Sequence, residues 1–386
     1  MASDGDGDRH AWAATELEDL GDGLYRIPLP LPGDALHAVN VYAIVGPDGV
    51  DLIDSGMAIV AAREKLTASL ARLGAGLGDI RNFFITHVHQ DHYTLAVELR
   101  TTLAGKISLG EGERVNLAAI AAAQAQRRFP GFIEMLPAMG AADLADKVKA
   151  MFTAEFAGPA AALPWEEPDE WLADGMVLDL GRRTLRAIHT PGHTAGHVVF
   201  HDEVSSLLFA GDHVLPRITP SIGFQPAVTR TALGDFLTSL QLMLKLPDSR
   251  LLPAHGPVGE STHARVNELL EHHEARLAQA LEGASGGPVT AFEVAEGIGW
   301  TRRMRKLADL DPMSQILAIG ETAAHLEVLV ARGQLVRQAS PDGLDTYAIP
   351  QMSLRSGGMG QCPSNTARSS SRGCCGYPSP PGSRRP

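Results

Sequence analysis

The fold is decided by the stretch Thr86-His87-Val88-His89-Gln90-Asp91-His92, which directly follows the apolar run 82–86. Neutral imidazole binds zinc and other borderline divalent metals, and a carboxylate adds a harder oxygen ligand. Because side chains alternate along an extended segment, His87 and His89 can point the same way. Asp91 and His92 lie past the bend and can face a second ion. The stretch therefore predicts a metal site at the end of a strand.

Three further metal-ligand candidates also follow strand-like apolar runs. His193 stands in His189-Thr190-Pro191-Gly192-His193-Thr194, where Pro-Gly forces a tight turn. Asp212 stands in Phe209-Ala210-Gly211-Asp212-His213, and His255 in Leu251-Leu252-Pro253-Ala254-His255-Gly256. Since each candidate comes at the end of a strand, all of them can converge on one edge of a sheet sandwich.

The bulk composition limits the classes of protein that the chain can be. Its 386 residues suffice for one large core and a small second domain. With 44% hydrophobic and 20% charged residues, it resembles an ordinary soluble globular protein. The net charge of -12 opposes non-specific phosphate binding, which needs a positive field. No apolar run approaches the roughly 20 residues that a membrane-spanning helix needs, so no membrane role is expected.

The termini and the cysteines indicate the compartment. The acidic N-terminus lacks the basic start and apolar stretch of a secretory signal. All three cysteines, Cys362, Cys374 and Cys375, stand in the tail 351–386. This position argues against a disulfide framework in the core and against cysteine ligation of the main metal site. The cytoplasm is the expected compartment.

Residues 21–262 predict one large domain of strands and helices, preceded by a flexible acidic leader over residues 1–20. Gly46-Pro47-Asp48-Gly49 is a hairpin turn signal, and residues 58–73 predict a helix. Strand-like runs occupy 24–27, 39–45, 50–53, 82–86, 176–180, 184–189, 197–201 and 206–210. The Ala-rich segment 113–157 predicts a helical insertion. It is either a lid over the site or a surface helical pair.

Residues 263–350 predict a linking helix and a small separate domain. An amphipathic helix over 263–282 is followed by a linker over 283–287. Helical stretches around 291–298 and 321–332 then precede two strands, at 334–337 and 346–349. Helices followed by a terminal hairpin suggest a winged-helix-like unit. The tail 351–386 is rich in Ser, Gly, Pro and Arg and is expected to be disordered.

The motifs, taken in order, resemble those of the metallo-β-lactamase superfamily over roughly residues 20–262. They are Asp54-Ser55-Gly56, the His-x-His-x-Asp-His run, and the single residues His193, Asp212 and His255. They are similar to the glyoxalase II branch and, with the C-terminal unit, to the human β-lactamase-like protein 2 group. The resemblance implies a mixed α/β fold, an αββα sandwich with a small C-terminal winged-helix-like domain.

The resemblance also implies a ligand set. His87, His89 and His193 would hold one metal, and Asp91, His92 and His255 the other. Asp212 would bridge the two metals, and Asp54 would support the ligands from behind. Zinc is the expected metal, with iron and manganese as alternatives, because all three fit a nitrogen and oxygen site.

The expected mechanism follows from two divalent ions. Ions about 3.5–4 Å apart can share a water and lower its pKa toward roughly 7, giving a hydroxide. The hydroxide would attack a carbonyl or phosphorus centre that one ion polarises. Asp91 is expected to be both a ligand and a catalytic residue that orients or accepts the proton. Asp54 is assigned with it to the catalytic set.

Some positions depart from the family pattern or admit two interpretations. Tyr93-Thr94-Leu95-Ala96 follows the run where family members often carry Gly-Gly. Tyr93 either offers its hydroxyl to substrate or simply packs. Arg217 either contacts an anionic substrate or is an ordinary surface arginine. The aspartate at 212 argues against the true β-lactamase branches. His89, in place of the Glu of related diiron proteins, favours hydrolysis over redox chemistry.

The other histidines and the basic cluster are expected to be structural. His197 either donates a hydrogen bond to the ligands or is a satisfied core histidine, which is the favoured interpretation. His189 and His213 are expected to pack or orient ligands. His272 and His273 are expected to be solvated on a helix face. The basic cluster at 302–306 is interpreted as a solvated face or channel wall in preference to a nucleic-acid surface.

The sequence therefore predicts a metal-dependent hydrolase of a small activated acyl compound, a thioester first and a lactone second. A metal-dependent ribonuclease is the alternative enzyme, although the net charge of -12 and the lack of aromatics interleaved with Lys and Arg oppose it. A nucleic-acid-binding protein acting through the C-terminal domain is the non-enzyme alternative. The ranking rests on family analogy. The sequence does not indicate an oligomeric state.

Overall fold

The computed structural model describes residues 10–33, 36–126, 128–155, 163–301 and 303–350. The expected disordered tail and its three cysteines lie outside these residues. The first sheet is β1 (Glu18–Gly21), β2 (Leu24–Pro30), β3 (Ala38–Gly46), β4 (Gly49–Ile53), β5 (Ile80–Ile85), β6 (Lys106–Gly110) and β7 (Glu170–Leu172), in that order. It is antiparallel up to β4 and parallel from β4 to β7.

Local sequence explains this change of direction. The predicted turn between β3 and β4 forms a hairpin, in which Gly49 takes a φ of +135° that other residues rarely adopt. Parallel neighbours need a longer crossover. Helix α2 (Val60–Arg72) supplies it between β4 and β5, and α3 (Gln90–Arg100) between β5 and β6.

The second sheet has the strand order β12-β11-β10-β9-β8. Its strands are β8 (Val177–Asp179), β9 (Thr184–His189), β10 (Val198–Asp202), β11 (Leu207–Gly211) and β12 (Arg250–Pro253). Strands β8 to β11 are antiparallel, whereas β11 and β12 are parallel and are connected through α7 (Ala232–Met243). The ends of β9, β11 and β12 therefore deliver three ligand candidates.

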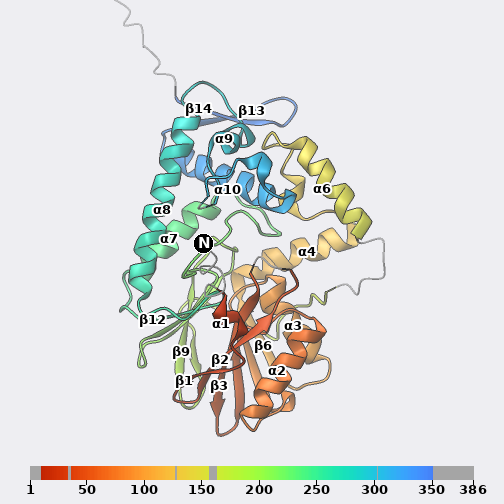
Figure 1. Ribbon diagram of the computed structural model, residues 1–386, viewed down its shortest axis with the longest axis vertical. Coiled ribbons are helices and arrows are strands. Elements are labelled where there is room, and N and C mark those ends of the chain that lie inside the picture. The colour runs from red at the N-terminus through yellow and green to blue at the C-terminus, as the bar shows by residue number, and fades with distance from the viewer. Residues whose placement is uncertain (1–9, 34–35, 127, 156–162, 302, 351–386) are drawn as a thin grey trace, which may run out of the picture. The chain divides into compact units, whose positions relative to one another are not determined.

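Three apolar clusters define the layers of an αββα sandwich. Phe84 of the first sheet and Phe200 and Phe209 of the second belong to the cluster between the two sheets. A second cluster joins the first sheet to α2 and α3. The third joins the second sheet to α7 and α8 (Thr262–Gly283). Figure 1 shows α2 and α3 on one side of the strands and α7 and α8 on the other. The predicted fold class is confirmed.

The insertion is helical, as predicted, and packs on the C-terminal helices. It comprises α4 (Arg114–Gln126), α5 (Gly131–Glu134) and α6 (Ala142–Glu155). Ile133 and Leu144 of the insertion share one core with Ile316 and Ile319 of α10 (Pro312–Ala331). Helix α9 (Ala291–Gly297) precedes α10, and the hairpin of β13 (Val336–Ala339) and β14 (Asp345–Ala348) follows it. The predicted order of helices and hairpin is thus observed.

Two predicted boundaries differ from the structure. Helix α10 begins at Pro312 and not near Glu321, because Asp311 caps it by accepting a hydrogen bond from the Ser314 backbone N–H. The leader expected over residues 1–20 contains α1 (Ala11–Ala14) and β1. Glu18 of β1 accepts a hydrogen bond from Arg26 Nε at 2.6 Å, which ties β1 to β2.

Short 3₁₀ turns complete the described secondary structure. They span Leu77–Asp79, Glu111–Glu113 and Leu307–Asp309. None of the described helices has the length and apolar character needed to cross a membrane.

Candidate metal centre

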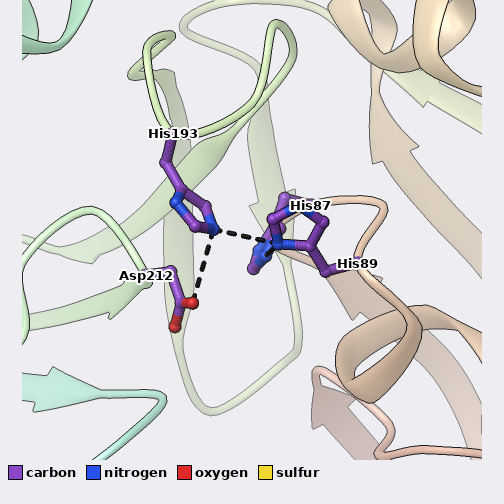
Figure 2. A group of neighbouring side chains, drawn as sticks. All are labelled: His87, His89, His193 and Asp212. Carbon is purple, nitrogen blue, oxygen red and sulfur yellow. Dashed lines mark hydrogen bonds and ion pairs between the residues drawn. The ribbon is translucent and has the colours of Figure 1, made fainter. Parts of the chain in front are cut away.

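The seven predicted ligands come together at one edge of the sandwich. His87 and His89 follow β5, and Asp91 and His92 lie in the first turn of α3. His193, Asp212 and His255 follow β9, β11 and β12 respectively. Figure 2 shows His193 and Asp212 approaching His87 and His89 from opposite loops. The side chains of the seven residues form two groups with metal-binding spacing. The first group is His87, His89, His193 and Asp212, and the second is Asp91, His92 and His255.

In the first group, the ring nitrogens are close together. His87 Nε2 and His193 Nε2 each lie 3.0 Å from His89 Nδ1. Asp212 Oδ2 lies 3.4 Å from His193 Nε2. Three imidazole nitrogens and one carboxylate oxygen therefore face a common point.

Asp212 also belongs to the second group. Its Oδ1 lies 3.4 Å from His255 Nε2 and 3.8 Å from His92 Nε2. Asp91 Oδ2 lies 3.4 Å from His255 Nε2 and 3.7 Å from His92 Nε2. Each oxygen of Asp212 thus faces a different group, which is the arrangement that a bridging ligand requires.

Buried atoms without hydrogen-bond partners test whether divalent ions fit these groups. Within the described residues, His92 Nε2, His255 Nε2 and Asp212 Oδ1 are buried and accept or donate no hydrogen bond. Leaving a buried polar group unsatisfied costs about 1–3 kcal/mol. All three atoms face the second group, so one divalent ion would satisfy them together. The residues present fit two divalent ions.

The opposite ring nitrogens orient the histidines. His193 Nδ1 donates to the Ser221 carbonyl and His255 Nδ1 to the Ala38 carbonyl, each at 2.8 Å. His89 Nε2 donates to the Phe224 carbonyl at 3.1 Å. Because a carbonyl oxygen only accepts, these nitrogens carry the protons, and the lone pairs of the other nitrogens point into the centre.

The two groups differ in their electrostatics. Burial lowers the pKa of His89 to about 3 and also lowers the pKa values of His87 and His193, so these imidazoles are neutral. Burial also acts to lower the pKa of His92, but the carboxylates of Asp54 and Asp91 more than offset it and raise the pKa to about 10. Without an ion, the second group therefore retains a proton among its carboxylates.

Asp54 positions His92 and does not reach the reacting side of the centre. Its Oδ2 accepts from His92 Nδ1 at 2.9 Å, and its Oδ1 accepts from the Thr86 backbone N–H at 2.8 Å. The residue adopts a φ of +61°, a conformation that costs about 1–3 kcal/mol in most non-glycine residues. The carboxylate thus lies on the Nδ1 side of the His92 ring, which is the supporting position, and the assignment of Asp54 to the catalytic set stays a prediction.

Sequence reasoning missed Glu113, which connects two ligand loops. Its buried carboxylate accepts from Thr194 Oγ1, from Asn116 Nδ2 at 2.6 Å and from the Val88 backbone N–H at 3.4 Å. Burial raises the pKa of Glu113 to about 7, although the hydrogen bonds oppose this. No pattern marks residue 113, because the loops meet it only in the folded chain.

His197 also supports the centre. Its Nε2 accepts from the Asp212 backbone N–H at 3.1 Å, so its Nδ1 donates to Thr190 Oγ1 at 2.8 Å. The sequence left two alternatives for His197, a hydrogen bond donated to the ligands or a satisfied core position. In the structure His197 is buried and accepts a hydrogen bond from the Asp212 backbone instead of donating one. His213 is buried edge-on against Phe236, as a packing residue.

The structure separates the two alternatives for Tyr93. The buried Tyr93 hydroxyl donates to the Glu166 carbonyl at 2.6 Å, and its ring stacks on Trp165. These contacts favour the packing alternative for Tyr93, and its contact with substrate stays a prediction. Arg217 is exposed on the loop after β11, and its contact with substrate stays a prediction.

The remaining histidines agree with the prediction in part. His189 Nε2 donates to the Leu172 carbonyl at 3.1 Å. His272 is exposed, as predicted, but His273 is fully buried. The prediction for His273 was wrong because α8 is covered by α10 on that face.

Comparisons with known proteins agree with this geometry. Residues 34–255 match the metallo-beta-lactamase superfamily, and residues 277–350 match the metallo-beta-lactamase-like C-terminal domain. The chain is 27% identical to the probable metallo-hydrolase YqjP of Bacillus subtilis, over 79% of this chain and 91% of that one. It is 32% identical to the lactamase-like protein nscB of Aspergillus fumigatus, over 33% of this chain and 41% of that one.

Solved structures are similar over most of the chain. A beta-lactamase domain protein from Burkholderia ambifaria has a TM-score of 0.70 and 26% identity, over 86% of this chain and 94% of that one. A metallo-beta-lactamase family protein from Thermus thermophilus has a TM-score of 0.64 and 28% identity, over 86% of this chain and 100% of that one. With more than half of its residues matched and a His/Asp metal-binding cluster in place, the chain belongs to the metallo-beta-lactamase superfamily of metallo-hydrolases.

Proposed function

We propose that this protein is a dinuclear metal hydrolase of small activated acyl compounds, with a thioester as the first candidate and a lactone as the second. The observation that carries the proposal is the double group of ligands that shares Asp212. The resemblance to the glyoxalase II branch ranks the thioester first. Zinc is the proposed metal, because three neutral imidazoles dominate the first group.

Two bound divalent ions would supply an activated water and would polarise the acyl carbonyl. His87, His89 and His193 would hold one ion, and Asp91, His92 and His255 the other. Asp212 fixes both positions at once, because one of its oxygens faces each group. In the protein without ions, burial acts to raise the pKa of Asp91, but the charges of His92 and His255 more than offset it, so Asp91 is ionised before an ion binds. It is therefore the proposed acceptor of the proton released during hydrolysis.

An apolar wall beside the centre supports an acyl substrate. The Phe224 ring lies 6.3 Å from the His89 ring and 4.1 Å from the ring of Phe132, which belongs to the insertion. Such a wall fits a hydrocarbon or thioester group better than a phosphodiester backbone. The net charge of -12 also disfavours a polyanion. The insertion is therefore proposed to border the substrate, as a lid would.

The test is hydrolysis of a generic thioester, a lactone and a short RNA by the native protein and by His89→Ala. Metal content is measured in parallel by plasma mass spectrometry. Thioester or lactone turnover that His89→Ala loses, with at least about two equivalents of zinc in the native protein, supports the proposal. His272→Ala is the matched control, because this exposed histidine contacts neither ligand group. Metal-dependent RNA cleavage without acyl turnover overturns the proposal in favour of the ribonuclease.

A further inference from the structure

A second cluster of metal-ligand types lies where the linking helix meets the C-terminal domain. His273 of α8 and His325 of α10 are 0% and 2% exposed, and their rings stack with centroids 5.3 Å apart. Glu321 precedes His325 by one helical turn, so both point to one face of α10. One ligand atom of each residue lies within 4.8 Å of the others. Glu321 is partly exposed, whereas the two histidines are buried.

The hydrogen bonds fix where the lone pairs point. His325 Nδ1 donates to the Glu321 carbonyl at 2.7 Å, so His325 Nε2 has a lone pair directed at His273. His193 and His255 of the dinuclear centre are oriented in the same way, each by a backbone carbonyl on Nδ1. An imidazole anchored at one nitrogen with the other directed inward is the usual arrangement of a metal-binding histidine.

The distances also match those of the dinuclear centre. His273 Nδ1 and His325 Nε2 lie 3.1 Å apart, against 3.0 Å for the imidazole pairs around His89. Two nitrogens that each bind zinc at about 2.05 Å, with a tetrahedral angle between them, are about 3.3 Å apart. The observed separation is therefore close to that of two ligands on one ion.

The two rings also fit a plain hydrogen bond from His273 Nδ1 to His325 Nε2. In either arrangement His273 Nε2 is buried without a partner among the described residues, so the choice between them depends on Glu321, which adds a carboxylate to the pair. Burial lowers the pKa of His325 to about 4 and also lowers that of His273, so both rings are neutral and able to bind a metal. Arg276 is the cation that faces Glu321, but its guanidinium stacks on Trp300 and donates to the Gly299 carbonyl.

We propose that His273, Glu321 and His325 bind a third divalent ion of the zinc class, which links α8 to the C-terminal domain. Two imidazoles and one carboxylate are a ligand set that zinc accepts, with water in the fourth position. The site is separate from the dinuclear centre, because the rings of Phe236 and His213 lie between His273 and His197. The inference does not depend on the substrate of the hydrolase.

Zinc titration of chelator-treated native protein tests the proposal, with bound metal measured by plasma mass spectrometry. We expect about three equivalents in the native protein and about two in Glu321→Gln and in His325→Gln. His272→Ala should keep all three, because its side chain is the exposed neighbour of His273. His89→Ala should weaken the dinuclear centre and retain the third ion, which separates this proposal from the proposed function.

Cobalt substitution supplies a second readout that does not depend on activity. Absorption from tetrahedral cobalt with nitrogen and oxygen ligands should persist in His89→Ala, and it should fall by the contribution of one ion when Glu321→Gln is added to it. Circular dichroism before metal addition verifies that each variant is folded. A native protein that takes up no third equivalent overturns the proposal. A folded Glu321→Gln/His325→Gln double variant that binds the same amount as the native protein also overturns it.

Discussion

Replacing Asp54 by Asn should weaken only the ion held by the second ligand group. Asp54 Oδ2 accepts the proton of His92 Nδ1, while Asp54 Oδ1 accepts from the Thr86 backbone N–H. The Thr86 hydroxyl is a third donor to the Asp54 carboxylate. An asparagine has one oxygen for these donors, so at least one hydrogen bond is lost in either orientation of its amide. Asparagine tolerates the positive φ of this position, so the backbone has no reason to move.

The lost bond has a defined consequence for the ligand. When the amide N–H group faces His92 Nδ1, the ring proton is driven to Nε2, which lies 3.7 Å from Asp91 and 3.8 Å from Asp212. Nε2 then has no lone pair for an ion. Loss of such a supporting partner lowers metal affinity about 10–100-fold, or about 1.4–2.7 kcal/mol. Because the side chains of Asp54 and His92 are both buried, we expect the loss of affinity to lie toward the upper end of this range.

Bound metal is measured by plasma mass spectrometry after equilibration with graded concentrations of a chelator of known affinity. The variant should release the ion of the second ligand group at a lower chelator concentration than the native protein, and it should keep the ion of the first group unchanged. Asp202→Asn is the control, because Asp202 is equally buried but pairs with Arg183 at the opposite end of the strands. Simultaneous loss of both ions, or unchanged binding of both, would refute the reasoning.

Three further predictions concern pH and packing. His92 must lose a proton with a pKa of about 10 before it binds an ion, so calorimetric titrations should show the affinity for the second ion falling about tenfold per pH unit as pH decreases. Because the pKa of His92 is raised in the folded state, the free energy of unfolding of the ion-free protein should fall as pH rises from 6.5 to about 10. Gly192→Ala should cost at least about 3 kcal/mol in urea unfolding, since its Cβ would lie 2.4 Å from Phe236 at a φ of +137°, whereas Gly234→Ala should be neutral or stabilising. Phe209→Ala should cost about 3–5 kcal/mol in the same assay, because the ring is fully buried between the sheets; less than about 1 kcal/mol would contradict the layer assignment.

The metal ligands could be predicted because their signal is local. Each follows an apolar run that forms a strand, and the ends of neighbouring strands meet at one edge. Strands β1 and β7 could not be predicted in this way, because they are short edge strands whose order depends on their neighbours. Glu18 of β1, for example, is held by Arg26 of β2. Nothing within residues 18–21 indicates that partner.

The supporting residues could not be predicted because their partners are distant in sequence. Glu113 lies 81 residues from Thr194, and its carboxylate accepts a hydrogen bond from the Thr194 hydroxyl. The carbonyls that orient His193 and His89 belong to Ser221 and Phe224, in a loop with no metal-binding motif. A backbone carbonyl is present at every residue, so sequence patterns cannot mark the ones that act. His273 was misjudged for the same reason, since its burial depends on α10.

The loop of Ser221 and Phe224 gives the insertion and the C-terminal domain a common role. It orients two ligands of the first group, and its Phe224 ring packs on Phe132 of the insertion. Ile222 of the same loop shares a core with Ile316 of α10. The loop has no regular secondary structure of its own, so these contacts are what fix its carbonyls. The two appended helical parts therefore help to set the geometry of the first ion, because without them the protons of His89 and His193 would have no fixed acceptors.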